Sequence, residues 1–200
     1  MFFRKTKEEY GGLSNMASGY PIKINNIQIL SSEALYQAMR FPNYPEIQKE
    51  IILQKSPMTA KMKSKKYREY TRSDWEDIKL IIMRWCLRVK LIQNWDKFGS
   101  LLLSTKGKDI VEESNKDSFW GAIPSDKYLL VGVNALGRLL MELRDELPQY
   151  LNSKELSVPN IIDFKLCGNS INALDFNTNN LPKTIQKNSE IKYESLSLFD

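Results

Sequence analysis

The sequence contains no histidine and only two cysteines, Cys86 and Cys167. Without histidine the chain cannot use imidazole acid–base catalysis, a Ser-His-Asp or Cys-His nucleophile, or a metal site with histidine ligands. The cysteines lack metal-site spacing, and such a low number is typical of a reduced compartment, so we expect a cytoplasmic location. Catalysis must come from carboxylates, lysines and aromatic side chains, and we expect neither a metal nor a cofactor.

Long apolar runs are also missing. No segment approaches the ~20 apolar residues that a membrane-spanning helix requires. The first ten residues, MFFRKTKEEY, lack the apolar run of a signal peptide. The sequence thus predicts an intracellular protein without a membrane partner.

The composition is that of a globular protein with a modest excess of positive charge. Of the 200 residues, 42% are hydrophobic and 10% are aromatic, which is enough for one domain with a substantial core. The net charge of +5 permits a polyanionic partner such as nucleic acid or a phosphorylated ligand, but many cytosolic domains are equally basic. Charge alone therefore leaves the partner open.

Apolar periodicity predicts a mainly α fold, a compact helical domain with a minor β-hairpin. The hairpin is expected at residues 20–29, around the turn Asn25-Asn26. The longest helix, about 74–95, is apolar over most of its circumference and should be central, with Asp74 as its N-cap. Further helices are expected at residues 32–42, 44–54, 97–104 and 134–147, the last capped by Asn134.

The composition changes beyond Pro148 and divides the chain into two parts. Residues 1–150 form the predicted main domain, and residues 151–200 form a C-terminal extension. Within the extension, the stretch NIIDFKLCG is expected to dock as a strand or strap. Residues 172–195 are rich in Asn, Ser and Lys, a composition typical of a flexible polar tail.

The segment SSEALYQAMRF, residues 31–41, places Glu33, Gln37 and Arg40 in one stripe of a helix, beside an apolar stripe. In one interpretation Glu33 is a favourable charge near the positive end of the helix dipole, contributing ~0.3–1 kcal/mol. In the other, a buried helix directs the carboxylate into a cleft, where Gln37 and Arg40 orient a polar ligand. The spacing alone does not decide between them.

Lys79 and Lys90 of the expected central helix share a face with Met83 and Cys86. Both lysines can extend their ammonium groups to water along the apolar surface. Alternatively, one of them ends in a cleft, where desolvation lowers its pKa and makes it a general base or a Schiff-base nucleophile.

Two further segments combine residue types that suit nucleotide binding. KDSFWGA, residues 116–122, offers Asp117 to hold a ribose, Trp120 to stack a base and Gly121 for close approach, although a turn around a buried tryptophan fits equally. VGVNALG, residues 131–137, precedes a helix whose N-terminus suits a phosphate. It is a poor dinucleotide-binding motif because no acidic partner for the ribose follows it.

The segment 61–72 is a basic run. It holds six Lys or Arg residues and one acidic residue, interleaved with Tyr67 and Tyr70. Such a run is typical of a surface that contacts a nucleic-acid backbone, and equally of a solvated loop.

Several of these segments resemble, in the same order, the motifs of the NADAR family, also called YbiA-like. They are GLSNM (12–16), SEALYQAMRF (32–41), SPMTAK (56–61), the stretch from Trp75 to Gln93, IVEESNKDSFWG (110–121) and GVNALGRLLMELR (132–144). The resemblance covers about residues 10–147. It implies that residues 1–150 are a mainly α catalytic domain, an N-glycosidase that acts on ribosylated nitrogen heterocycles.

The resemblance also implies roles for individual residues. Glu33 would stabilise an oxocarbenium-like centre or activate water, while Asp117 holds ribose hydroxyls. In a second route Lys90 attacks the opened sugar and forms a Schiff base, with Lys61 as the reserve lysine. The residues expected to bind substrate are Gln37, Arg40, Lys61, Trp75, Trp120, Gly121, Asn134 and Gly137.

The chain departs from the family pattern at three places. Ala34 replaces a histidine, which therefore cannot be essential here, and Leu91 replaces a phenylalanine. The stretch WGAIPSDKYLLVG lacks the usual second glycine, so the loop on the substrate side is expected to differ.

Two activities are associated with the family. One removes ADP-ribose from guanine in DNA, and the basic run and the C-terminal extension favour it here. It implies ADP-ribosylated DNA as the substrate and a cognate DarT-type toxin as the opposing protein. The other hydrolyses phosphorylated ribosylamino intermediates of riboflavin synthesis. A third hypothesis is a non-catalytic module that binds an ADP-ribose-like small molecule.

Overall fold

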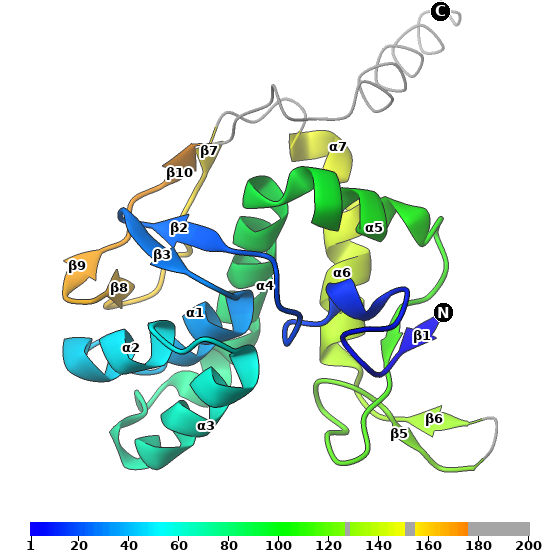
Figure 1. Ribbon diagram of the computed structural model, residues 1–200, viewed down its shortest axis with the longest axis horizontal. Helices are drawn as coiled ribbons and strands as arrows, with labels where there is room; N and C mark the ends of the chain where they lie inside the picture. The colour runs from blue at the N-terminus through cyan, green and yellow to red at the C-terminus, as the bar shows by residue number, and fades with distance from the viewer. Residues whose placement is uncertain (127–128, 151–154, 176–200) are drawn as a thin grey trace, which may run out of the picture.

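A long buried helix, α4 (Trp75–Gln93), lies at the centre of the structure (Figure 1). The structure is a computed structural model and describes residues 1–126, 129–150 and 155–175. From Ile82 to Leu91 every residue of α4 except Arg84 and Arg88 is buried, so this half of the helix is enclosed over most of its circumference, as predicted. Ile81, which the sequence also predicts on the buried face, is 40% exposed. In the described part of the chain, every helix is too short or too polar to cross a bilayer.

The start of α4 differs from the sequence prediction. Asp74 occupies the N-cap position, but its side chain makes no capping hydrogen bond. Its Oδ1 and Oδ2 instead accept hydrogen bonds from Nε and Nη2 of Arg72, at 2.6 and 2.9 Å. A two-pronged contact with a guanidinium is stronger than a bond to a backbone amide, which explains the difference.

Three helices pack together beside α4. The helix α1 (Ser32–Ala38) is buried along its whole length, and Ser31 caps it by accepting a hydrogen bond from Ala34 N at 3.2 Å. It contacts α2 (Pro45–Ile52), α3 (Pro57–Lys66) and α4. The remaining helical elements are the 3-10 turns η1 (Gly11–Leu13) and η2 (Arg68–Tyr70), the π-helical turn η3 (Trp95–Gly99), and the helices α5 (Ser100–Ser104), α6 (Ala135–Asp145) and α7 (Leu147–Tyr150).

The prediction of a mainly α fold with a minor hairpin is wrong, because the structure is a mixed α/β fold. Of the described residues, 44% are helical and 14% are in strands. The expected hairpin is one of five two-stranded sheets in the described ranges. The pairs are β1 (Phe2–Phe3) with β4 (Val111–Glu112), β2 (Ile22–Ile24) with β3 (Ile27–Ile29), β5 (Ile123–Pro124) with β6 (Leu130–Val131), β7 (Glu155–Leu156) with β10 (Leu174–Asp175), and β8 (Lys165–Leu166) with β9 (Asn169–Ser170).

The small strands escaped prediction for a physical reason. Apart from the hairpin they are two residues long, so they show no alternation that a sequence pattern can detect. The parallel pair β1–β4 joins residues that are more than a hundred positions apart, with Phe2 opposite Val111. This pair matters for the site because β4 carries Glu112.

The segment 155–175 packs against the helices. Gln48 of α2 donates a hydrogen bond through Nε2 to Lys165 O at 3.0 Å and accepts one at Oε1 from Cys167 N at 2.6 Å. The ring of Phe164 lies edge-on to Trp85, with centroids 4.9 Å apart. The domain boundary at residue 150 stays a prediction, and the expected polar tail beyond residue 175 lies outside the described residues.

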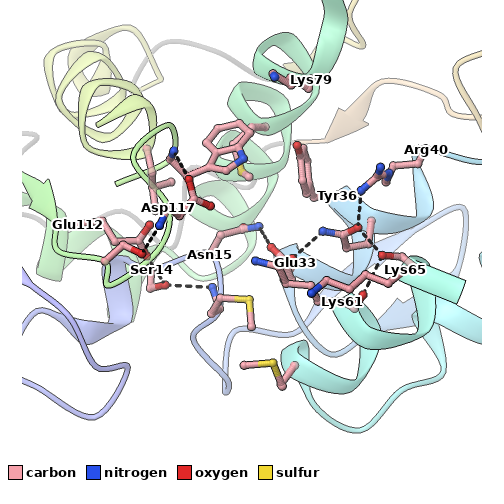
Figure 2. Close-up of a pocket in the computed structure, with 18 of the residues that line it drawn as sticks. Ser14, Asn15, Glu33, Tyr36, Arg40, Lys61, Lys65, Lys79, Glu112 and Asp117 are labelled. Carbon is pink, nitrogen blue, oxygen red and sulfur yellow. Dashed lines mark hydrogen bonds between the residues drawn. The ribbon is translucent and has the colours of Figure 1, made fainter. Parts of the chain in front are cut away.

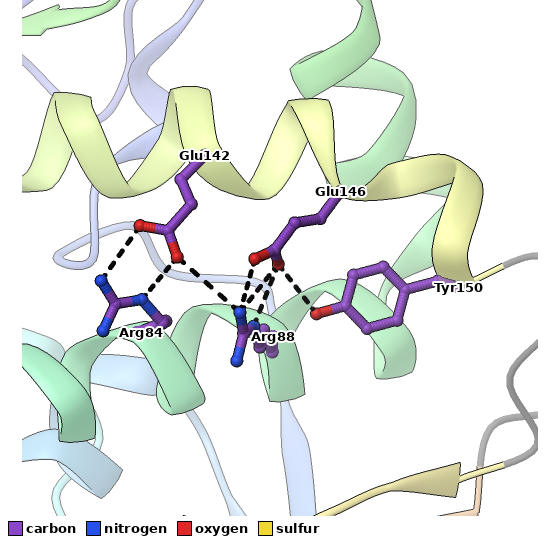
Figure 3. A network of polar contacts seen from close by, with 5 residues as sticks. All are labelled: Arg84, Arg88, Glu142, Glu146 and Tyr150. Carbon is purple, nitrogen blue, oxygen red and sulfur yellow. Dashed lines mark hydrogen bonds and ion pairs between the residues drawn. The ribbon is translucent and has the colours of Figure 1, made fainter.

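A polar network joins α4 to α6 along one side (Figure 3). Glu142 accepts hydrogen bonds from Nε and Nη2 of Arg84 at 2.5 and 3.0 Å. Glu146 accepts a hydrogen bond from Arg88 Nη2 at 2.7 Å and another from Tyr150 OH at 3.2 Å. Shared charge-assisted hydrogen bonds of this kind hold α6 in one position along α4.

Candidate active site

A pocket of about 560 Å³ opens between α1 and α3 on one side and the segment 112–120 on the other (Figure 2). Residues 14–16, which follow η1, and the first half of α4 complete its wall. The pocket brings together seven of the residues expected from the sequence: Glu33, Gln37, Arg40, Lys61, Trp75, Asp117 and Trp120.

Glu33 is a buried carboxylate in the wall of this pocket, with 4% of the residue exposed. Asn15 Nδ2 donates a hydrogen bond to its Oε2 at 2.6 Å, and Gln37 Nε2 donates one to its Oε1 at 2.8 Å. Burial raises the pKa of Glu33, while the positive charge of Lys61 and the two amide hydrogen bonds oppose that rise. Glu33 is therefore held inside the cleft and is not a solvated charge at a helix end.

Gln37 is itself held in one orientation by a second helix. Its amide oxygen accepts hydrogen bonds from Ser64 Oγ of α3 at 2.6 Å and from Arg40 Nη1 at 3.4 Å. Because this oxygen is occupied, the amide nitrogen is left to donate to Glu33. The polar stripe seen in the sequence is thus one hydrogen-bonded chain from Arg40 through Gln37 to Glu33.

A second carboxylate, Glu112 on β4, also lines the pocket. Its Oε1 accepts a hydrogen bond from Ser14 Oγ at 2.9 Å. Burial, helped by the negative charges of Glu33 and Asp117, raises the pKa of Glu112 to about 7, against the opposing effects of Ser14 and Lys61. The adjacent residues Ser14 and Asn15 therefore each bind one of two carboxylates with raised pKa values (Figure 2).

Sequence reasoning missed Glu112, Asn15 and Ser14 as site residues. The only signal was their place in the motifs GLSNM and IVEES, which carry the family resemblance. Neither motif has a helical or alternating pattern that predicts which side chain faces a cavity.

Three predicted substrate-binding residues, Gly121, Asn134 and Gly137, do not line the pocket and instead support β4. Asn134 has a left-handed backbone (φ 51°) and makes no side-chain cap for α6. Its Nδ2 donates to Ile110 O at 2.8 Å, and its Oδ1 accepts from Glu112 N at 3.1 Å. A Cβ atom on Gly137 would lie 2.1 Å from Ile110 O, and one on Gly121 would lie 2.4 Å from Glu112 O. These three residues therefore contact the backbone of Ile110 and Glu112 and fix the position of Glu112.

Aromatic rings form one wall of the pocket. Tyr36 of α1 lies between Trp75 and Trp120, with ring centroids 5.1 and 5.6 Å away. The guanidinium carbon of Arg40 lies 4.9 Å from the centre of the Trp75 ring. Such a wall offers both stacking surface and a neighbouring cation to a flat ligand.

Asp117 fixes the turn that presents Trp120. Its Oδ1 accepts hydrogen bonds from the backbone nitrogens of Phe119 and Trp120 at 3.1 and 2.8 Å. Ser114 Oγ accepts a hydrogen bond from the Asp117 nitrogen at 3.0 Å and so holds the carboxylate at the pocket wall. The segment is a turn around a tryptophan that also faces the pocket, and its predicted role in holding a ribose and stacking a base stays a prediction.

Basic side chains surround these groups. The residues of the basic run 61–72 have different environments. Lys61, Lys65 and Arg68 line the pocket, whereas Lys63 forms an ion pair with Glu50 at 3.1 Å. Arg4, Arg40 and Lys79 add further positive charge. Within the described ranges, no group of three or more Cys, Asp or Glu side chains is arranged to hold a metal ion.

Lys90, expected as a catalytic lysine, does not line the pocket. It is fully buried, and its Nζ donates to Gly12 O at 2.7 Å and to Ser14 O at 3.0 Å. Nζ also lies 4.3 Å from the ring centres of Tyr20 and Phe98. Burial lowers the pKa of Lys90 strongly. Its contacts place it as the anchor of the backbone before Asn15, out of reach of a ligand in the pocket.

Comparison with known proteins identifies the class. The NADAR domain family model matches residues 1–148, so the chain belongs to the NADAR domain family. The solved NMR structure of the Escherichia coli protein YbiA has the same fold, with a TM-score of 0.65, 34% sequence identity and coverage of 76% of this chain and 88% of that one.

The names of individual similar proteins indicate an activity. The N-glycosidases YbiA of Shigella boydii and of Escherichia coli K12 are each 36% identical over 145 residues, which is 72% of this chain and 86% of theirs. A riboflavin biosynthesis protein of Vibrio vulnificus is 34% identical over 152 residues, 75% of this chain but 39% of that longer protein. These matches support a general function as an N-glycosidase, a hydrolase of N-glycosyl bonds.

The buried position of Lys90 predicts its chemical behaviour. Treatment of the folded protein with ribose 5-phosphate and cyanoborohydride should modify Lys61, which lines the pocket, and leave Lys90 unmodified. Peptide mass spectrometry measures both sites, and the urea-unfolded protein, in which Lys90 should react, is the control. An adduct on Lys90 in the folded protein would show that this lysine reaches the pocket after all.

Proposed function

We propose that the chain hydrolyses the N-glycosyl bond of ADP-ribosylated guanine in DNA and so removes the ADP-ribose. The observation that carries the proposal is the pair of carboxylates, Glu33 and Glu112, with raised pKa values in one pocket that also has an aromatic wall and a basic surround. Cleavage of a bond between C1′ and nitrogen passes through a positively charged oxocarbenium-like centre, and paired carboxylates are suited to such a reaction.

Glu33 is the group that would face the positive centre. In its ionised form it stabilises the charge at C1′ or takes a proton from the attacking water. Asn15 supports this role in two ways. Its Nδ2 binds Glu33, and its Oδ1 is buried without a hydrogen-bond partner among the described residues. That oxygen is left to accept a hydrogen bond from the water or the substrate.

Glu112 is the proposed proton donor. With a pKa of about 7 it is protonated in a large fraction of molecules at neutral pH. As the bond from C1′ to nitrogen breaks, the leaving nitrogen takes the proton of Glu112, and water adds to C1′ and gives its proton to Glu33. Product release and exchange with solvent then return the proton to Glu112. The overall reaction consumes one water and needs no redox partner.

The remaining pocket residues would bind the substrate. Trp120 and Trp75 offer faces for the base or the sugar, and Asp117 a carboxylate oxygen for ribose hydroxyls. Lys61, Lys65 and Arg68 supply positive charge to the diphosphate of an ADP-ribosyl group or to a DNA backbone. A DarT-type toxin would supply the modified DNA, and a cytoplasmic location belongs to the same proposal.

A second candidate substrate is a phosphorylated ribosylamino intermediate of riboflavin synthesis. The names of the relatives from Vibrio vulnificus and Zea mays, both riboflavin biosynthesis proteins, favour it. A small phosphate ester uses fewer cations than a DNA strand, so its binding should depend less on salt concentration.

Substitution of Glu33 tests the proposed activity. Glu33→Gln should lower the release of ADP-ribose from an oligonucleotide carrying ADP-ribosylated guanine by ~10²–10⁴-fold, because the amide can neither stabilise a cation nor take a proton. Chromatography of released ADP-ribose measures the rate. Glu46→Gln, at an exposed position of α2 away from the pocket, is the matched control.

Three outcomes of that assay are distinct. Normal release by Glu33→Gln would contradict the role of Glu33. No release by the folded wild type, with turnover of a ribosylamino phosphate instead, would favour the second candidate. Binding of ADP-ribose without turnover of either substrate would leave a binding module.

The raised pKa of Glu112 predicts a pH profile. Because Glu112 must be protonated to act as an acid, the rate should fall as pH rises through about 7. Ser14→Ala removes a hydrogen bond that lowers the pKa of Glu112, so it should move this descending limb to higher pH. Glu112→Gln should abolish the limb and reduce the rate. A limb that stays unchanged in both variants would exclude Glu112 as the acid.

A further inference from the structure

A second hollow, of about 430 Å³, adjoins the pocket on the side of η2. It shares Arg40, Arg68, Trp75 and Glu76 with the pocket, so a ligand that fills the pocket can extend into it. The arginines Arg40, Arg68 and Arg72 all line this hollow, which we call the arginine hollow.

Residues that line the arginine hollow carry buried polar atoms without a partner in the described part of the chain. Among the described residues, Arg40 Nε, Thr71 Oγ1 and Arg72 Nη1 are buried without a hydrogen bond. Buried donors are nearly always satisfied in folded proteins, because losing contact with water costs free energy that only a new partner recovers. Three such atoms on residues that line one hollow indicate that an acceptor-rich group belongs there.

Arg72 is held in place for such a group. Asp74 binds its Nε and Nη2, and Nη2 also donates to Ile162 O at 2.7 Å. The side chain is only 7% exposed. These contacts fix the guanidinium and leave Nη1 as the nitrogen without a partner among the described residues. A donor held in one orientation loses little entropy when a ligand binds it.

The charges around the hollow favour an anion. Arg40 is partly buried near Arg68, and both burial and that neighbouring charge lower its pKa. The acidic groups nearby have cationic partners, because Asp74 pairs with Arg72 and Glu76 pairs with Lys79. An anion would relieve the repulsion between the guanidinium groups. Its oxygens must also accept several hydrogen bonds, which is the chemistry of a phosphoryl group.

We propose that the arginine hollow is a phosphoryl-binding site that holds a phosphate of the substrate next to the catalytic pocket. The proposed function determines only where this phosphate comes from. It is either the diphosphate of an ADP-ribosyl group or the backbone phosphate of a nucleic acid. Both offer the same oxygens to Arg40, Thr71 and Arg72, and the experiment below separates them.

Thr71→Val tests the site with little change of shape. The valine keeps the approximate volume of threonine but removes the hydroxyl. Since Oγ1 has no hydrogen bond to any residue that the structure describes, folding should not be weakened. Arg68→Gln removes one charge at an exposed position of the hollow. Lys66→Gln removes the same charge from an exposed residue of α3 that lines neither cavity, and serves as the control.

Isothermal titration measures the binding of ADP-ribose and, separately, of an unmodified single-stranded oligonucleotide. Thermal unfolding first verifies that each variant is folded. If the site holds the diphosphate, Thr71→Val and Arg68→Gln should each weaken ADP-ribose binding by ~10-fold, the value of one hydrogen bond to a charged group, while Lys66→Gln leaves it unchanged. If it holds a backbone phosphate, the same two variants weaken only the oligonucleotide.

Wild-type affinity of both variants for both ligands would overturn the proposal. Equal weakening of ligand binding by Lys66→Gln would also overturn the proposal, because the loss of affinity would then follow from the lower net charge and not from the arginine hollow. None of these measurements needs turnover. A protein that fails to release ADP-ribose from DNA can therefore still show phosphate-dependent binding at the hollow, and the two proposals fail separately.

Discussion

The site depends on the hydrogen bonds that keep the Glu33 carboxylate buried. One comes from Gln37, a turn further along the same helix, and the other from Asn15, which reaches Glu33 from the loop after η1. A carboxylate without such partners could not remain charged at this depth. Both amides must themselves be oriented. The amide of Gln37 is oriented by Ser64, so α3 must pack against α1. The amide of Asn15 depends on the loop after η1, which must be anchored to the core.

The anchor of that loop is the most unusual group in the core. Lys90 places its amino group at a fully buried position, where Nζ donates to two backbone carbonyls and lies against two aromatic rings. Its place in the last turn of α4 links the central helix to the backbone of Gly12 and Ser14. On the other side, Asn134 connects α6 to β4 and so sets the position of Glu112. Both carboxylates are thus held by elements distant in sequence.

These links explain what could and could not be predicted from the sequence. Long periodic segments identified α1 and α4, and the spacing of Glu33, Gln37 and Arg40 correctly placed them on one face. Lys90 was misplaced because a helical stripe shows which residues share a face, but not whether that face meets a cavity or a loop. Glu112 was missed because it lies in a two-residue strand whose partner strand, β1, is more than a hundred residues away in the sequence.

We propose that Glu33 and Glu112 act on one substrate. Carbon-13 NMR of labelled glutamate carboxyl groups, recorded during a titration with ADP-ribose, tests this proposal. The resonances of Glu33 and Glu112 should shift together with a single dissociation constant, while those of Glu142 and Glu146, in the network between α4 and α6, should stay constant. A saturating titration that leaves the Glu33 resonance unmoved would contradict it.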